Sequence, residues 1–139
     1  GVQRMNRFIV LLLLFAIVSC AKFETAPTRI FDISSGVVDL SIELGGNWDK
    51  VCFITPYTDN EGAKEVLGFD FNVEDKSSIS ILDGITLVIA TKGSQVIEYF
   101  ETPRSNIDFS SLNSGCFSKF NAKFKVVKDN NGWPNVQNT

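Results

Sequence analysis

The chain has 139 residues, with 13 basic and 16 acidic side chains and no histidine. This length suits one domain built on a single hydrophobic core. The acidic balance argues against nucleic-acid binding, which needs clustered Lys or Arg. Without histidine, a Ser-His-Asp or Cys-His catalytic arrangement is excluded.

The N-terminal segment has the pattern of a secretory signal peptide. Arg4 and Arg7 lie on either side of Met5 and are followed by an apolar stretch that runs from Phe8 to Val18. Such a stretch is too short for a bilayer core, which needs about 20 residues, and it ends at a small residue. Residues 1–4 stand ahead of Met5, a natural start, and are interpreted as additional to the signal.

The end of this stretch, Ile17-Val18-Ser19-Cys20, resembles the lipobox of bacterial lipoproteins. The resemblance implies that residues 1–19 are removed as a signal peptide and that Cys20 carries diacylglycerol. Residues 20–30 then form a lipidated tether. A plain signal peptide or an N-terminal anchor, with Cys20 incidental, is the alternative. By resemblance to Gram-negative lipoproteins, the absence of Asp after Cys20 implies the outer membrane, facing the periplasm; this does not apply to a Gram-positive organism.

The mature chain is acidic and has two further cysteines. Losing Arg4 and Arg7 leaves 11 basic against 16 acidic residues, a net charge of −5. Membrane attachment would therefore come from acyl chains, at about 0.8 kcal/mol per buried methylene. In an oxidising compartment Cys52 and Cys116 are expected to form a disulfide, with two buried thiols as the alternative. Two cysteines without histidine do not make a zinc site, so we expect neither metal nor cofactor.

The first half of the expected globular domain, residues 31–128, predicts strands and one helix. Residues 37–44 alternate like a half-buried strand and also fit one helical face; their β-branched content favours a strand. Residues 48–56 predict a strand in the middle of a sheet. Residues 58–67 predict a helix, which Thr58 or Asp59 caps and Gly68 ends. The helix residues expected to face the core are Ala63, Val66 and Leu67.

The second half is rich in predicted strands. Residues 77–82 and 85–91 predict strands joined by a hairpin at Asp83-Gly84. After a turn at 92–95, a strand at 96–101 is closed by Pro103 and Arg104, and residues 105–115 form a loop or a single helical turn. Residues 116–127 predict one strand, with Phe120, Ala122, Phe124 and Val126 on one face. Residues 129–139 are expected to be a flexible tail.

Together these elements predict an α+β fold. We expect a single small domain, with a mainly antiparallel sheet and one or two short helices packed on one face. A second resemblance concerns residues 48–57, WDKVCFITPY, with Leu67-Gly68-Phe69 and a later Pro103-Arg104. The pattern resembles small uncharacterised bacterial proteins, many of them lipoproteins, over Leu40 to about Val127. It implies one compact fold and no particular activity.

The candidate binding residues are polar and aromatic: Trp48, Asp49, Pro56, Tyr57 and Arg104. A functional interpretation puts them on one rim, where Arg104 would hold a carboxylate or phosphate. The structural alternative, which we favour, makes Trp48 and Tyr57 aromatics at the edge of the core and pairs Asp49 with Arg104.

The sequence favours a membrane-anchored module that binds a protein or an envelope component and is not an enzyme. The alternative is an inhibitor or immunity-type lipoprotein against a lytic enzyme, with a protruding loop at 101–116. An enzyme would need carboxylates that converge in a cleft. The spread acidic residues are instead interpreted as a solvated face: Asp70, Glu74, Asp75 and Asp83.

Overall fold

The computed structural model describes residues 25–112, 115–128 and 132–139. The expected signal peptide, Cys20 and residues 21–24 of the tether lie outside this part of the chain. Within it, no helix is both long and apolar enough to cross a membrane.

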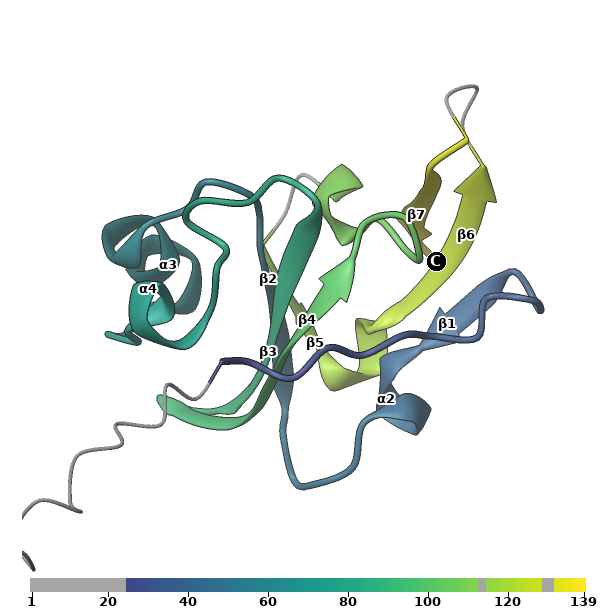
Figure 1. Cartoon of the computed structure of the whole chain (residues 1–139). Coiled ribbons are helices and arrows are strands. Elements are labelled where there is room, and N and C mark those ends of the chain that lie inside the picture. The colour runs from purple at the N-terminus through teal and green to yellow at the C-terminus, as the bar shows by residue number, and fades with distance from the viewer. Residues whose placement is uncertain (1–24, 113–114, 129–131) are drawn as a thin grey trace, which may run out of the picture.

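The described residues form three layers, an arrangement that Figure 1 shows. A four-stranded sheet in the order β4-β3-β2-β5 lies between a helical layer and a three-stranded sheet in the order β1-β6-β7. Every strand pair is antiparallel. The strands are β1 (Val37–Asp39), β2 (Lys50–Ile54), β3 (Ile85–Lys92), β4 (Gln95–Pro103), β5 (Cys116–Ser118), β6 (Lys123–Lys128) and β7 (Pro134–Asn138).

The helices are short. The helical layer consists of α3 (Asn60–Leu67) and α4 (Val73–Lys76), and the remaining turns are α2 (Leu40–Glu43), η2 (Phe109–Ser111) and η3 (Lys119–Asn121). This confirms the expected α+β class, with a mainly antiparallel architecture and short helices on one face of a sheet. The second sheet, which covers the other face, was not expected.

The central strands β2 and β3 are buried on both faces because each face has its own covering layer. Cys52 and Ile54 pack toward α3 and α4, whereas Val51 and Phe53 pack toward the second sheet. Strands buried on both sides are apolar throughout rather than alternating, as residues 51–54 are. The predicted position of this strand in the middle of a sheet is confirmed.

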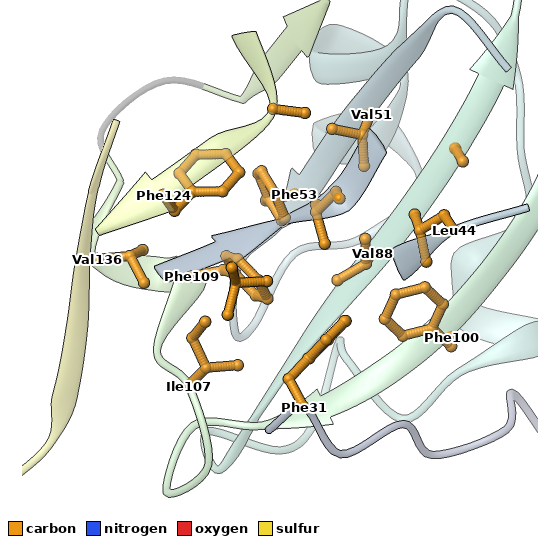
Figure 2. Close-up of a cluster of buried hydrophobic side chains, with 14 of the residues drawn as sticks. Phe31, Leu44, Val51, Phe53, Val88, Phe100, Ile107, Phe109, Phe124 and Val136 are labelled. Carbon is orange, nitrogen blue, oxygen red and sulfur yellow. The ribbon is translucent and has the colours of Figure 1, made fainter. Parts of the chain in front are cut away.

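Aromatic rings fill the core between the two sheets, as Figure 2 shows. The ring of Phe53 stacks on that of Phe109 with centroids 4.5 Å apart, and it meets the ring of Phe124 edge-on at 5.6 Å. Stacked and edge-to-face rings are the arrangements that aromatic quadrupoles favour. Phe124 lies on β6 and Phe109 on η2, so this cluster joins the second sheet to the central one.

The predicted disulfide between Cys52 and Cys116 is confirmed, and their Cα atoms lie 4.1 Å apart. The two residues face each other directly on β2 and β5. The amide of Phe53 donates to the carbonyl of Gly115 at 2.7 Å, so the cysteines occupy a neighbouring pair without backbone hydrogen bonds. Cα atoms are closest at such pairs, which is why a disulfide fits here.

The helix predicted over residues 58–67 is confirmed as α3. The side chain of Asp59 accepts from the amide of Gly62, and Gly68 ends the helix with a left-handed φ of 83°. Ala63 and Leu67 are buried, and Val66 packs against the same core. The predicted turn at 92–95, the following strand and the short helical turn within 105–115 are confirmed as well.

The strand predicted over 37–44 is only partly correct. It stops at Asp39, whose carboxylate accepts from the amide and hydroxyl of Ser41 and starts α2. Helical geometry then places Leu40 and Leu44 on the buried side and turns Ile42 to solvent. Local capping therefore ends the strand even though the apolar alternation continues.

The hairpin predicted at Asp83-Gly84 is wrong, because residues 77–82 form turns after α4 and no strand. The backbone amide of Ser77 donates to Val73, and its hydroxyl donates to Glu101 at 2.8 Å. Ile79 is buried by this arrangement, whereas Ile81 and Leu82 are exposed. The amides of Ser77 and Ser78, which a hairpin strand would have used, thus donate to the carbonyl of Val73 on α4 and to the carboxylate of Glu101 on β4.

Residues 116–127 form two strands in different sheets. β5 pairs with β2, the chain turns through η3, and β6 then pairs with β1 and β7. Ala122 and Phe124 are buried as expected, but Phe120 lies on the turn and is exposed. The chain must cross from one layer to the other here, and this breaks the alternation.

Both ends of the domain extend beyond the expected bounds. Ala26 is buried and Thr28 bridges to Glu101 on β4, so ordered structure begins within the expected tether. Residues 134–138 form β7 and bury Val136, which corrects the expected flexible tail for that segment. Residues 129–131 lie outside the described part of the chain.

Candidate binding surface

The four-stranded sheet has two ends, and the N-terminal segment approaches one of them. Thr28 pairs in parallel with Glu101 on β4, so the residues ahead of it run back toward the turn at 92–95, as can be followed in Figure 1. We call the end with this turn the tether end and the opposite end the distal end.

The sequence-predicted rim is divided between these two ends. β2 and β4 both run antiparallel to β3 and therefore in the same direction. Tyr57 follows β2 and Arg104 follows β4, so both lie at the distal end. Trp48 and Asp49 precede β2 and lie at the tether end. A single rim that contains all four residues is therefore wrong.

Trp48 is a core residue, only 2% exposed, as the structural interpretation predicted. Its indole nitrogen donates to the carbonyl of Leu44 at 3.4 Å, and the ammonium of Lys119 lies 4.8 Å from its ring centroid. Asp49 is exposed, and its backbone pairs with Thr91 and Lys119. The expected ion pair of Asp49 with Arg104 is wrong, because Arg104 pairs with another acid.

Both edges of the Arg104 guanidinium are already occupied. Nε donates to Asp108 at 3.0 Å, Nη2 donates to the same carboxylate at 3.3 Å, and Nη1 donates to the carbonyl of Asp83 at 2.8 Å. Asp108 is buried and also accepts from the amide and hydroxyl of Ser110. Two-point pairing of this kind fixes the guanidinium plane. Arg104 thus holds the distal end in shape and is not free to take up an anion.

Tyr57 is exposed and lies in a strained backbone conformation. It is 66% exposed, has a φ of 62° and donates its amide to the carbonyl of Ile79 at 2.8 Å. A left-handed conformation costs a residue with a side chain roughly 1–2 kcal/mol. Strain of this kind persists where the surrounding structure enforces it, often at binding sites. The hydrogen bond to Ile79 is one such constraint.

Exposed apolar side chains gather around Tyr57 and Arg104. Ile81, 72% exposed, and Leu82 follow directly on Ile79. Arg104 donates its backbone amide to the next turn, at Gly84, and its guanidinium lies 4.9 Å from the ring centroid of Trp133. We call this set the distal rim: Tyr57, Ile81, Leu82, Arg104 and Trp133. It holds four of the eight large hydrophobic side chains that are exposed in the described chain.

Three members of the distal rim were missed at the level of sequence. The sequence pattern predicts a hairpin strand for Ile81 and Leu82 and a flexible tail for Trp133. A tryptophan in a polar C-terminal segment was the available signal, because tryptophan is rare in solvated tails and enriched in binding surfaces.

The loop expected to protrude at 101–116 lies against the domain over its described length, in which Ser105 alone is exposed. Ile107, Asp108 and Phe109 are buried, and the amide of Asp108 donates to the carbonyl of Pro134. Residues 113–114 lie outside the described chain. The protruding loop of the inhibitor hypothesis is therefore not seen in residues 101–112 and 115–116.

The four acidic residues that were expected to face solvent, Asp70, Glu74, Asp75 and Asp83, are all exposed. Asp70 is exposed and pairs with Lys64 at 3.3 Å, and Glu74 accepts from the amide of Asn60 at the start of α3. The described residues contain no group of three or more His, Cys, Asp or Glu side chains placed to hold a metal ion. The pKa of Asp32 is lowered because its carboxylate accepts from Ser34, a local turn.

Comparison of this chain with protein-family models, with curated proteins and with solved structures finds no match. The lipobox and the geometry of the two ends are therefore the features that bear on function.

Proposed function

We propose that this chain is a lipid-anchored lipoprotein of the bacterial cell envelope whose domain binds a protein or an envelope component and is not an enzyme. Its proposed location is the outer membrane, facing the periplasm. Acyl chains on Cys20 attach it to the membrane, and the distal rim contacts the partner. The observation that carries the proposal is the concentration of exposed apolar and aromatic side chains at the end opposite the N-terminal entry.

The chemistry of the distal rim suits a protein partner. Aromatic residues and arginine are enriched at protein interfaces, and hot spots favour tryptophan and tyrosine. Burial of an exposed Ile, Leu or aromatic side chain contributes roughly 1.5–3 kcal/mol. Hydrogen bonds from Tyr57 and Arg104 already hold the segment 79–84 in place. Little conformational entropy is then lost on binding, which favours affinity.

The second candidate, an inhibitor or immunity-type lipoprotein, would use the same surface. For this candidate, the rigid and apolar distal rim is a better contact surface than the packed loop at 101–116. The two candidates differ in the partner: the inhibitor hypothesis requires a lytic enzyme whose activity falls when the rim is occupied.

Binding through the distal rim is tested by crosslinking the tagged, lipidated protein in its native envelope and comparing variants. Ile81→Ser removes an exposed apolar side chain from the rim, and Ile30→Ser removes one of similar exposure outside it. We expect the partner to be lost with Ile81→Ser and kept with Ile30→Ser. Recovery of the same partners with both variants would contradict the proposal.

The lipid anchor has a separate test. Cys20→Ser removes the sulfur that the lipobox resemblance identifies as the acylated atom. We expect it to abolish fatty-acid labelling and to leave an uncleaved precursor, detected by radiolabelling and by mass. A mutant protein that is labelled and normally processed would show that the chain is not anchored in this way.

A further inference from the structure

The two most exposed large apolar side chains of the described residues lie at the tether end. Phe120 on η3 is 99% exposed and Ile42 on α2 is 80% exposed. Neither contributes to the core, and neither belongs to the distal rim. A fully exposed phenylalanine is unfavourable in water, and exposed apolar side chains that gather at one place mark interaction sites.

These two side chains are held outward by ordered backbone. The amide of Leu40, at the start of α2, donates to the carbonyl of Ala122, immediately after η3, at 2.9 Å. Lys119 of η3 reaches back over the Trp48 ring and lies 3.5 Å from the carbonyl oxygen of Gly46. α2, the segment after it and η3 are thus joined. Phe120 and Ile42 are presented on a firm base.

The N-terminal segment leads toward this end of the molecule. The amide of Arg29 donates to Glu101, and the amide of Glu101 donates to Pro27, so the chain runs alongside β4 in the same direction. Before Thr28, the amide of Ala26 donates to the carbonyl of Lys76 at the end of α4, and Figure 1 shows this segment and the turn between β3 and β4 at the lower left of the view, with α2 at the lower right. Thr25 is five residues from Cys20, a reach of at most roughly 17 Å.

The distribution of charge agrees with this direction. Between Asp59 and Asp83, the segment that contains α3 and α4, seven acidic and two basic residues give a net charge of −5, the whole net charge of the mature chain. The tether end has the exposed acids Glu43 and Asp49 and, on β2, β3, η3 and β6, four lysines: Lys50, Lys92, Lys119 and Lys123. Basic side chains next to exposed apolar ones are typical of surfaces that meet anionic lipid headgroups.

We infer that the tether end docks on the bilayer, with Phe120 and Ile42 inserted at the level of the lipid headgroups. The inference rests on the proposed lipidation of Cys20, which holds the domain within reach of the membrane. Docking gives the domain a second attachment and a fixed orientation. The distal rim then faces away from the membrane, toward its partner.

The experiment places tryptophan probes at both ends of the lipidated chain in phosphatidylglycerol-containing vesicles with brominated acyl chains. Trp133→Phe is made first, to leave the buried Trp48 as background. Ile42→Trp reports on the tether end, and Tyr57→Trp, an exposed position at the distal end, is the matched control. We expect bromine to quench the probe at 42 and to leave the probe at 57 unquenched.

A second comparison measures the part played by Phe120. Because its ring is outside the core, Phe120→Ala is expected to leave the fold intact. In the chain with the probe at 42, it is expected to shift the equilibrium between docked and free orientations about tenfold toward the free one. Quenching of that probe would fall accordingly, while flotation with the vesicles is unchanged.

The outcomes separate the two proposals. A chain that does not float with vesicles lacks the anchor, and both proposals then fail. A chain that floats but shows equal quenching at 42 and 57 keeps the anchor and overturns the docking. A third outcome is that the tryptophan at 42 becomes shielded from solvent as the protein concentration rises, without quenching by bromine. This would mean that a second copy of the chain covers the surface, and it would also overturn the docking proposal.

Discussion

The disulfide between Cys52 and Cys116 is expected to supply a large part of the stability of the domain. The two cysteines are 64 positions apart in the sequence. In the chain-entropy model, closing a loop of this length stabilises the folded state by about 4 kcal/mol. Small domains unfold with a free energy of roughly 5–15 kcal/mol, so this one bond is a substantial fraction of the total.

The perturbation is the double variant Cys52→Ala/Cys116→Ala, compared with the oxidised wild type. Without the bond, residues 52 and 116 are no longer linked in the unfolded chain, which gains conformational entropy. In the folded chain, the loss of the buried Cys52 sulfur leaves a small void beside α3. Both effects lower the free energy of unfolding. With a urea m-value of roughly 2 kcal/mol/M, a loss of about 4 kcal/mol lowers the urea midpoint by about 2 M.

The assay is urea unfolding of the mature chain, followed through the emission of the buried Trp48. The reduced wild type is the control and should unfold near the midpoint of the double variant, because it lacks the same constraint. A double variant with the midpoint of the oxidised wild type would refute the loop-closure reasoning. Two free thiols in the denatured, non-reduced protein would refute the bond itself.

Three further predictions concern the packing, the two tryptophans and the chemistry. Gly115→Ala is expected to lower the free energy of unfolding in urea by about 1–3 kcal/mol, because the new Cβ would lie 2.6 Å from Cγ1 of Val66. Gly45→Ala, with open space around its Cβ, should be nearly neutral, and equal losses for the two variants would contradict this. Acrylamide should quench Trp133 more than Trp48, since Trp133 is 38% exposed; Trp133→Phe therefore lowers the quenching constant, and an unchanged constant would disprove the assignment. The mature chain is expected to show no ester, peptide or glycoside hydrolysis, a prediction that a turnover abolished by one Asp or Glu substitution would overturn.

Local chemistry made several elements predictable from the sequence. Asp59 and Gly68 cap α3 through contacts within a few residues, so the helix and its ends could be predicted without knowing the fold. The turn at 92–95 is also local. The disulfide followed from the even number of cysteines left after Cys20, and its existence required β2 and β5 to be neighbours. The lipobox resemblance is of the same kind, because it depends only on consecutive residues.

The tertiary structure decided which residues share a surface. Strand direction places Tyr57 and Arg104 together and sends Trp48 to the other end, and no local pattern encodes that direction. The apolar–polar alternation at 116–127 could not reveal that β5 and β6 belong to different sheets. Such a pattern indicates which side chains are buried but not which layer covers them. Phe120 is exposed because it lies on η3, where the chain crosses from one sheet to the other. Ile81 and Leu82 reach solvent because hydrogen bonds to distant strands and helices hold their segment in turns, and such bonds exist only once the layers have packed.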